Sequence, residues 1–210
     1  MKQILLKSSY TNNHDTVEVG IDEAGRGALA GPVTVAACIM PHGFQHELIK
    51  DSKLLSEREK MEARKLVLDN AIAYSVVHIP VEEIESTNIL KATLNGMRQC
   101  LDQIAENYDF QFILVDGDQF HGWNGIPFEA IPDGDNTYVS IASASILAKT
   151  ERDNYMRGIS RKKEYFAYGW GSNKGYGTKQ HRDAILNEGI TDEHRHSFVS
   201  HLLTKTSTLF

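Results

Sequence analysis

The chain has 210 residues, of which 41% are hydrophobic and 24% are charged, and these values are ordinary for one globular domain. Its formal net charge of −6 argues against a protein that coats nucleic acid by bulk electrostatics, and two cysteines are too few for a disulfide framework. The first residues lack a signal-peptide pattern and no apolar run is long enough to span a bilayer, so we expect a cytoplasmic protein without membrane contact.

Apolar runs and helical spacings alternate from the start of the chain. Two short β-branched runs, at 17–22 and 33–40, predict strands joined by a glycine-rich connection, which is a hairpin-like opening. Ser56 predicts the start of a helix, because Glu59 three residues later completes a capping box. The apolar run at 74–80 then predicts a third strand.

The spacing of apolar residues changes after this strand. Residues 81–104 repeat apolar side chains every three or four positions, which predicts an amphipathic helix or two abutting helices. The apolar run 112–117 predicts a central strand that is covered on both faces. Further on we expect a loop, a helix, a glycine-rich break and a capped helix, in that order over 118–135, 140–159, 169–177 and 178–189. This alternation indicates an α/β fold with a mixed sheet flanked by helices.

Acidic residues stand at the ends of two expected strands. Asp22 and Glu23 end the first strand, and Asp116 ends the strand 112–117. Asp135 stands shortly before the next expected helix. Ligand sites of open α/β sheets gather at strand ends, so these four carboxylates are candidates for one site.

The first strand limits how its two carboxylates can act together. Adjacent strand residues point to opposite faces, so Asp22 and Glu23 can serve one site only if the chain leaves β geometry there. Ala24 and Gly25 would allow that departure. For each acid taken singly, the alternative that it caps a helix or solubilises a loop stays open.

The residue types in this set predict a divalent-metal site. Four converging carboxylates would repel one another in a partly dry cleft unless a cation offsets their charge. Oxygen ligands without cysteine or histidine favour Mg²⁺ or Mn²⁺ over Zn²⁺. Two such ions about 4 Å apart could activate water and stabilise the leaving oxygen of a phosphodiester. The sequence therefore indicates metal-dependent phosphodiester hydrolysis.

Short motifs run in one order through nearly the whole chain. They are GIDEAGRG at 20–27, LAGPV at 29–33, DSK at 51–53, NIL at 88–90 with ATL at 92–94, VDG at 115–117, GD at 134–135, SIA at 140–142, ASILAK at 144–149, Arg152-Asp153, KGYGT at 174–178 with His181, and Arg195 with Ser197-Phe198. Together they resemble the bacterial ribonuclease HII family. The resemblance implies a ribonuclease H-like core over 1–165 and a small helical C-terminal region over 166–210 that contributes to substrate binding.

The resemblance also implies an activity and its metal ligands. Asp22, Glu23, Asp116 and Asp135 would bind two Mg²⁺ or Mn²⁺ ions and carry catalysis. The enzyme would hydrolyse the RNA strand of RNA/DNA hybrids and the phosphodiester 5′ to ribonucleotides embedded in duplex DNA. The products would carry 3′-hydroxyl and 5′-phosphate ends.

Substrate recognition is implied for a second set of residues. The backbone of Gly25-Arg26-Gly27 would read the 2′-hydroxyl, and Tyr176 would support recognition of the RNA–DNA junction. Glycines let a backbone approach a sugar closely, and the 2′-hydroxyl distinguishes RNA from DNA. Lys53 and Lys174 are candidate phosphate contacts. A tight loop with an exposed cation, a surface turn and solvated lysines are the plainer alternatives.

Some positions depart from the family pattern. Ala28 stands where the family usually has proline, Leu54 replaces a second lysine, and His196 replaces a basic residue. The loss of these two charges is expected to weaken DNA affinity. Two further acids, Asp118 and Asp133, lie next to the proposed ligands and are the alternative choices.

The sequence disfavours three alternative classes of protein. The related ribonuclease HIII carries an additional N-terminal domain, whereas only about sixteen residues precede the first expected strand. A binding module without chemistry is disfavoured by the four acids, and a P-loop protein by the absence of its lysine–serine/threonine ending. The end of the chain, with Leu209 and Phe210, faintly resembles tails that bind replication sliding clamps, although packing or disorder is favoured. A monomer is expected.

Overall fold

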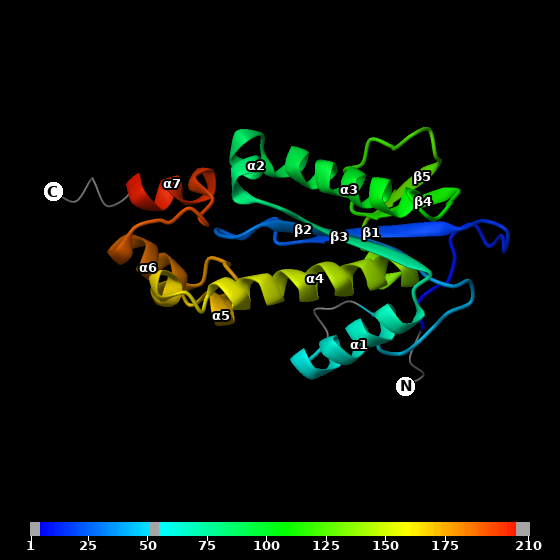
Figure 1. Ribbon diagram of the computed structural model, residues 1–210, viewed down its shortest axis with the longest axis horizontal. Helices are drawn as coiled ribbons and strands as arrows, with labels where there is room; N and C mark the ends of the chain where they lie inside the picture. The colour runs from blue at the N-terminus through cyan, green and yellow to red at the C-terminus, as the bar shows by residue number, and fades with distance from the viewer. Residues whose placement is uncertain (1–4, 51–54, 205–210) are drawn as a thin grey trace.

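A five-stranded mixed sheet forms the centre of the molecule (Figure 1). This computed structural model describes residues 5–50 and 55–204. The strands are β1 (Glu18–Ala24), β2 (Val33–Ile39), β3 (Ala73–Ile79), β4 (Phe112–Asp116) and β5 (Phe128–Ile131). Their order is β3-β2-β1-β4-β5, with antiparallel pairing from β3 to β1 and parallel pairing from β1 to β5. The structure therefore confirms the expected α/β class and mixed sheet.

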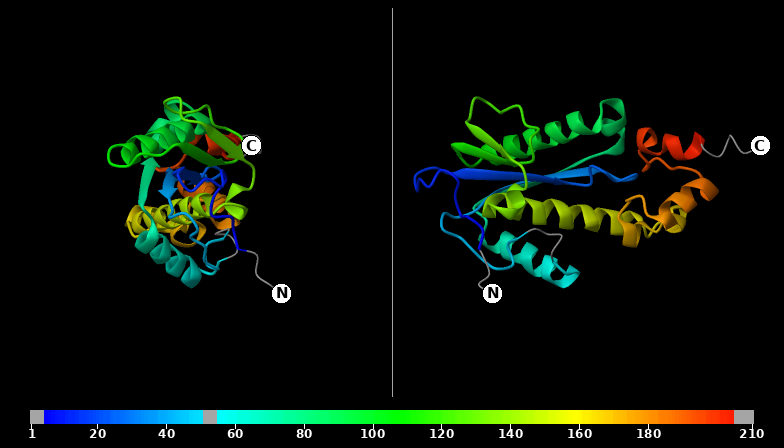
Figure 2. Two further views of the ribbon diagram at one scale, coloured as in Figure 1. Left: turned by 90° about the vertical axis from the view of Figure 1, so that its right-hand side faces the viewer. Right: turned by 180° about the vertical axis from the view of Figure 1, so that it is seen from behind.

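Helices cover both faces of this sheet (Figures 1 and 2). They are α1 (Glu57–Asn70), α2 (Val81–Ser86), α3 (Ile89–Ala105), α4 (Val139–Ile159), α5 (Trp170–Asn173), α6 (Lys179–Glu188) and α7 (His196–Thr204), with two 3₁₀ turns at Gly134–Asn136 and Lys163–Tyr168. Helices α2 and α3 lie on one face, and α4, with α1 outside it, lies on the other. Among the described helices, none is long and apolar enough to cross a bilayer.

The long helix α4 lies in direct contact with β1. A Cβ atom added to Gly20 would come within 2.3 Å of the Ser140 carbonyl carbon, so only glycine allows the helix start to approach the strand this closely. The first turns of α4 are correspondingly rich in small residues and almost wholly buried. This contact fixes the position of α4 relative to the strand that carries Asp22 and Glu23.

Most helix and strand expectations are confirmed. The Ser56 hydroxyl accepts a hydrogen bond from the amide of Glu59, and the Glu59 carboxylate accepts one from the amide of Ser56, which is the expected capping box. The periodic segment 81–104 is two abutting helices, because Asn88 accepts from the amide of Lys91 and begins α3. Both cysteines are free thiols in the core.

The expectation of a loop over 118–135 was wrong in part. The segment 118–135 was expected to be a loop, but it contains β5, a parallel edge strand that pairs with β4. Its side chains range from exposed to half-buried, so Phe128–Ile131 lacks the apolar alternation that marks a strand in sequence. The residues of this segment carry no strand signal of their own. Its pairing with β4 makes it a strand.

The C-terminal helices gather around an aromatic cluster at the far end of α4. Its buried members include Tyr168, Trp170 and Val199 from the C-terminal region, and also Ala30, Met156 and Tyr165 from the preceding part. The cluster therefore spans the expected boundary at 165/166, and the two regions share one packed interior.

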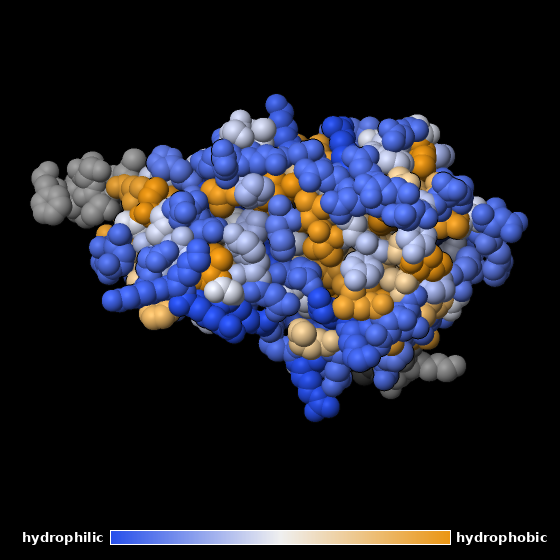
Figure 3. All heavy atoms as spheres, viewed as in Figure 1, coloured by the Kyte–Doolittle hydropathy of each residue, from blue (hydrophilic) through white to orange (hydrophobic). Residues whose placement is uncertain are grey.

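The outer surface of the molecule is largely hydrophilic on the face in Figure 3, with apolar side chains in small groups.

Candidate metal and nucleic-acid site

The four predicted carboxylates line a single cleft at the ends of β1 and β4. The residues that line it are Asp22, Glu23, Ala24, Gly25, Asp116, Asp135, Ser145, Lys149 and Tyr176. They come from two strands, the 3₁₀ turn before α4, α4 itself and the loop before α6. The tertiary structure thus brings together acids that are up to 113 residues apart, from 22 to 135, in the sequence.

Strand β1 delivers Asp22 and Glu23 to this cleft without leaving β geometry. Glu23 pairs with Val35 and Ala24 with Thr34 of β2, so the expected departure from β geometry does not occur at Ala24 and begins only at Gly25, which has a φ of +93°. Pairing with β4 ends at Ile21, however, and the edge of β1 beyond that point is not covered by β4. Side chains from both faces of β1 can therefore reach the cleft at this open edge.

A backbone contact positions the other two acids. The Asp116 carboxylate accepts a hydrogen bond of 2.7 Å from the amide of Gly134. This contact ties the 3₁₀ turn to the end of β4, and the next residue, Asp135, lies in the cleft with 3% of its surface exposed. The alternative acids, Asp118 and Asp133, are exposed and do not line the cleft.

The carboxylates of β1 are held in an environment that disfavours their charge. Burial raises the pKa of Asp22 well above its usual value, and the neighbouring charges of Glu23 and Asp116 raise it further. The hydroxyl of Ser145 donates to Asp22 and acts in the opposite direction. Burial also raises the pKa of Glu23, against the lowering effect of Arg26, which lies 3.1 Å from its carboxylate. A cation bound among these groups would relieve the repulsion.

The same carboxylates do not form a closed metal cage on their own. Within residues 5–50 and 55–204, no group of three or more His, Cys, Asp or Glu side chains is arranged to hold an ion. Magnesium commonly binds through one or two carboxylates, with water and substrate phosphates supplying the remaining oxygens. The all-oxygen donor set and its mutual repulsion fit an open site of that kind.

Two polar residues that line the cleft were absent from the predicted site. Ser145 and Lys149 lie one turn apart on α4, so both face the carboxylates. The Lys149 ammonium is 2.8 Å from Asp153 and 5.7 Å from the centre of the Tyr176 ring. Asp153 thus makes an ion pair with Lys149 on the same helix. The i, i+4 spacing of Ser145 and Lys149 was a visible signal, but nothing in it told which face of α4 meets β1.

The predicted substrate-binding residues are placed unequally. Gly25 and Tyr176 line the cleft, whereas the exposed Arg26 pairs with Glu23 at its rim. Lys174 does not line the cleft, since its ammonium donates to the carbonyl of Gly171. Lys53 lies outside the described residues, as does Leu54, and nothing is assigned to either.

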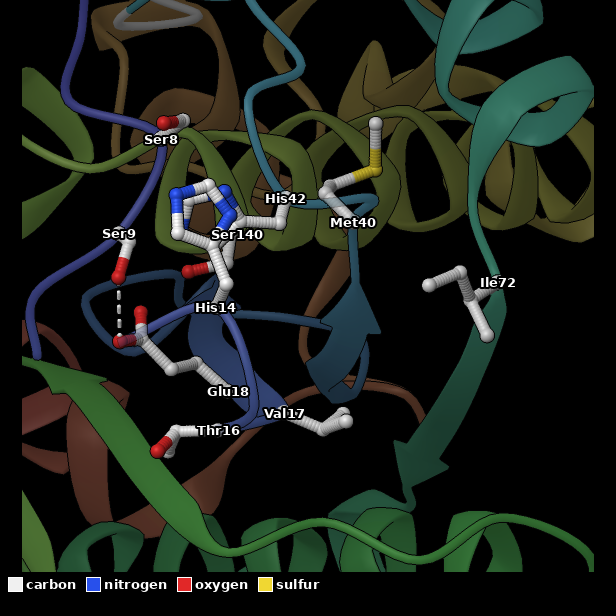
Figure 4. Close-up of a pocket in the computed structure, with 10 residues that line it drawn as sticks. All are labelled: Ser8, Ser9, His14, Thr16, Val17, Glu18, Met40, His42, Ile72 and Ser140. Atoms are coloured by element: carbon white, nitrogen blue, oxygen red, sulfur yellow. Dashed lines mark hydrogen bonds between the residues drawn. The ribbon is translucent and has the colours of Figure 1, made fainter. Parts of the chain in front are cut away.

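A second pocket lies at the opposite end of β1 (Figure 4). Glu18 lines it, and its carboxylate accepts hydrogen bonds from the Ser9 hydroxyl, the Tyr10 amide and the Thr11 amide. The imidazole rings of His14 and His42 lie against each other there, with centroids 3.8 Å apart. These contacts attach the N-terminal segment to the sheet and leave Glu18 with its acceptor sites used by the protein itself.

The fold and the acidic cleft together define a class of protein. A mixed five-stranded sheet with helices on both faces carries carboxylates from the ends of adjacent parallel strands, next to lysine and tyrosine side chains. The arrangement of the sheet and its helices is the ribonuclease H fold. Two solved structures share the fold, at TM-scores of 0.66 and 0.68.

Comparison with known proteins specifies the family. The family model described as ribonuclease HII matches residues 19–201. A ribonuclease HII from Bacteroides thetaiotaomicron is 45% identical over 186 residues, which cover 89% of this chain and 91% of the relative. The chain therefore belongs to the ribonuclease HII family, and it is a ribonuclease H that hydrolyses nucleic acid.

The two solved structures are more distant in sequence. One is the PCNA:RNase HII complex from Archaeoglobus fulgidus, which is 22% identical and is matched over 85% of this chain and 93% of that one. The other is Bst-RNase HIII in complex with Mn²⁺, which is 18% identical and is matched over 94% of this chain and 72% of that one. At these identities the likeness concerns the fold alone.

Proposed function

We propose that this endonuclease hydrolyses the phosphodiester on the 5′ side of ribonucleotides, both in RNA/DNA hybrids and embedded in duplex DNA. The products carry 3′-hydroxyl and 5′-phosphate ends. The observation that carries the proposal is the convergence of Asp22, Glu23, Asp116 and Asp135 in one cleft beside Gly25 and Tyr176. A place for phosphate-bound cations thus adjoins a backbone segment and an aromatic ring that can contact a sugar.

We assign the same four carboxylates as ligands of Mg²⁺ or Mn²⁺, two ions in all during catalysis. When bound, the ions supply the Lewis-acid chemistry that activates water and stabilises the leaving oxygen. The Mn²⁺ complex of the Bst-RNase HIII neighbour is consistent with this choice of cation. Ser145 holds Asp22 through its hydroxyl, and Gly134 holds Asp116 through its amide.

Recognition of the ribose is assigned to the loop after β1 and to Tyr176. The two glycines of the loop differ, because a Cβ atom on Gly27 would meet nothing within 4 Å. The open side of Gly27 is therefore the place where a sugar can approach the backbone. Arg26 is exposed enough to meet a phosphate while it also offsets the charge of Glu23. Lys53 and Lys174 stay candidates for contacts to the DNA backbone.

A single cleavage assay tests this function. The protein is offered a duplex that contains one ribonucleotide, beside an all-DNA duplex, with and without Mg²⁺. We expect cleavage only at the ribonucleotide and only with metal. Cleavage of the all-DNA duplex, or undiminished cleavage after chelation of the metal, contradicts the proposal. End-labelling then tells whether the break lies on the 5′ side of the ribose.

The division of labour between regions is part of the same proposal. Residues 1–165 supply the carboxylates, and residues 166–210 add the Tyr176 side of the substrate site. We propose that the protein acts as a monomer in the cytoplasm, where bacterial DNA lies and where free thiols such as Cys38 and Cys100 persist. Sedimentation at micromolar concentration tests the monomer.

A sliding-clamp contact is a weaker proposal about a partner. The Archaeoglobus fulgidus neighbour is a complex of ribonuclease HII with PCNA. In this chain the contact is assigned to the last residues, with Leu209 and Phe210, which lie outside the described residues. Pull-down with the bacterial clamp should recover the full chain better than a chain without these two residues. Equal recovery removes this partner.

A further inference from the structure

Arg152 of α4 is a fully buried cation that donates hydrogen bonds to backbone carbonyls. None of its surface is exposed, and its guanidinium donates hydrogen bonds to the carbonyls of Pro32 at 2.9 Å, Lys174 at 2.9 Å and Ala30 at 3.0 Å. These three acceptors come from two separate segments, the connection after β1 and the loop before α6. Without the guanidinium, three buried carbonyls would lose a donor each.

The same guanidinium contacts both segments to which ribose recognition is assigned. A Cβ atom on Gly25 would lie 1.9 Å from the Nε atom of Arg152, so the side chain of Arg152 occupies the space that any larger residue would need. On its other side, the guanidinium carbon lies 5.3 Å from the centre of the Tyr176 ring. Arg152 is therefore placed between Gly25 and Tyr176 and packs against each.

A second buried guanidinium holds only one of these segments. Arg195, which is also fully buried, donates to the carbonyl of Arg26 at 2.9 Å and twice to the carbonyl of Gly31. Burial, together with the charge of Arg152, lowers the pKa of Arg195 to about 9. Two neighbouring buried cations are costly. Together they donate six hydrogen bonds to five carbonyls, four of which belong to the connection after β1 that contains Gly25-Arg26-Gly27.

We propose that Arg152 is a positioning residue, which holds the Gly25-Arg26-Gly27 loop and Tyr176 in one fixed mutual placement, while Arg195 fixes the loop alone. The assignment of these two segments to the ribose rests on the proposed function, whereas the mechanical claim does not. The three carbonyls accept from three different nitrogens of the guanidinium, Nε, Nη1 and Nη2, whereas a lysine offers a single nitrogen and cannot reach all three positions.

Hydrogen exchange tests the mechanical claim without any substrate. We compare Arg152→Lys with Arg64→Lys, a matched control in which a half-buried arginine bound to the neighbouring Glu151 is changed. Arg152→Lys should speed amide exchange about tenfold in 25–32 and 174–178, and Arg64→Lys should change neither segment. Unchanged exchange in either segment, or a uniform rise over the whole chain, overturns the proposal.

Kinetics test the consequence for recognition. On a duplex with one ribonucleotide, Arg152→Lys should lower kcat/KM by about ten- to a hundredfold, mainly through KM. In a Tyr176→Ala background the same change should cost much less, because the placement that it disturbs no longer matters. Equal losses in both backgrounds return Arg152 to a general structural role. If the unaltered protein fails to cleave, the proposed function fails while the exchange result still decides the positioning.

A second variant covers the case in which Arg152→Lys does not fold. Arg195→Lys should speed exchange in 25–32 but leave 174–178 unchanged. In the unaltered protein, the amides of Leu29 and Ala30, which both donate to the carbonyl of Gly175, should exchange with protection within about threefold of that of Gly175. Separate opening of the two segments at low denaturant contradicts their being held in one mutual placement.

Discussion

Acidic residues lie near both ends of β1, but their surroundings are opposite. At the first end, Glu18 accepts hydrogen bonds from the hydroxyls of Ser9 and Thr11 and from the amides of Tyr10 and Thr11, at 2.7–2.9 Å for the shortest of each. At the other end, Asp22 accepts from the Glu23 amide at 2.6 Å and from Ser145 while like charges surround it. The carboxylate with many donors attaches the N-terminal segment to the sheet, whereas the carboxylate of Asp22 lies among like charges with fewer donors.

The two surroundings have opposite effects on the stability of the fold. Hydrogen bonds to an ionised carboxylate stabilise a fold, whereas carboxylates that repel one another in a buried cleft destabilise it until a ligand arrives. Burial alone does not separate the two cases. What distinguishes the two carboxylates is the balance between hydrogen-bond donors and like charges around each. Substitutions at the two ends should therefore have opposite effects on stability.

The largest expected effect is on turnover at the carboxylate end. Asp116→Asn keeps an oxygen that can accept from the amide of Gly134 but removes a negative charge from the cleft. We expect kcat to fall by at least about a thousandfold, or about 4 kcal/mol of barrier, with an unchanged circular dichroism spectrum. Single-turnover cleavage measures it. Normal turnover at saturating Mg²⁺ would remove Asp116 from the site and erase the contrast.

The opposite end should respond in stability instead. Glu18→Ala removes the acceptor for four donors of the N-terminal segment, and we expect the free energy of unfolding to fall by about 2–3 kcal/mol. Urea denaturation measures the loss. Turnover of the folded variant at saturating substrate should stay within about twofold of normal, since no residue of the cleft is touched. A stable Glu18→Ala protein with impaired turnover would invert the comparison.

Lowering the pH should reduce the free energy of unfolding through the buried His194. The buried His194 has its pKa lowered to about 4, by burial first and by His181 second, and its Nδ1 accepts from the amide of Thr191 at 2.9 Å. The unfolded chain binds this proton more tightly, so stability is complete above about pH 6.5 and falls as the pH drops toward 4. We expect a loss of about 2 kcal/mol over that window. In His194→Gln the stability at neutral pH is lower, but this slope should disappear.

The carboxylate cleft should titrate in the opposite sense in the metal-free protein. Because the folded state raises the pKa of Asp22, the folded state holds that proton more tightly, and the destabilising effect present at neutral pH declines as the pH falls through the raised pKa. Asp22→Asn should therefore raise the melting temperature at pH 7 by a few degrees without metal, while it abolishes cleavage. A lower melting temperature for this variant would show that Asp22 stabilises the fold as Glu18 does.

The smallest effect is expected in the loop beyond β1. Gly27→Ala should change the free energy of unfolding by less than about 0.5 kcal/mol, because the added methyl group meets nothing within 4 Å, but it should raise KM for the single-ribonucleotide duplex about threefold. Gly25→Ala is the matched control, and it should unfold far more easily because Arg152 and a φ of +93° both oppose it. An unchanged KM for Gly27→Ala would detach this loop from the substrate.

Local patterns predicted much of this molecule. The capping box at Ser56 and the strand that ends in Asp116 are confirmed, because each depends on residues that are near one another in the chain. Of the two possibilities left open for 81–104, one helix or two abutting helices, the structure has the second. The strand β5 was missed because its pairing with β4, not its own composition, makes it a strand. The continuation of β1 through Ala24 was missed for the same reason, since β2 holds it.

The acids of the site were visible in the sequence, because a carboxylate at the end of an apolar run is a local feature that needs no partner to be noticed. Only the tertiary structure decided which other side chains lie near these acids. Ser145 and Lys149 face the cleft because Gly20 lets α4 lie against β1. Arg152 contacts Gly25 and Tyr176 because three distant segments converge on one buried position. Which side chains share a cleft depends on contacts across the whole chain, and only packing of the complete sheet and its helices determines those contacts.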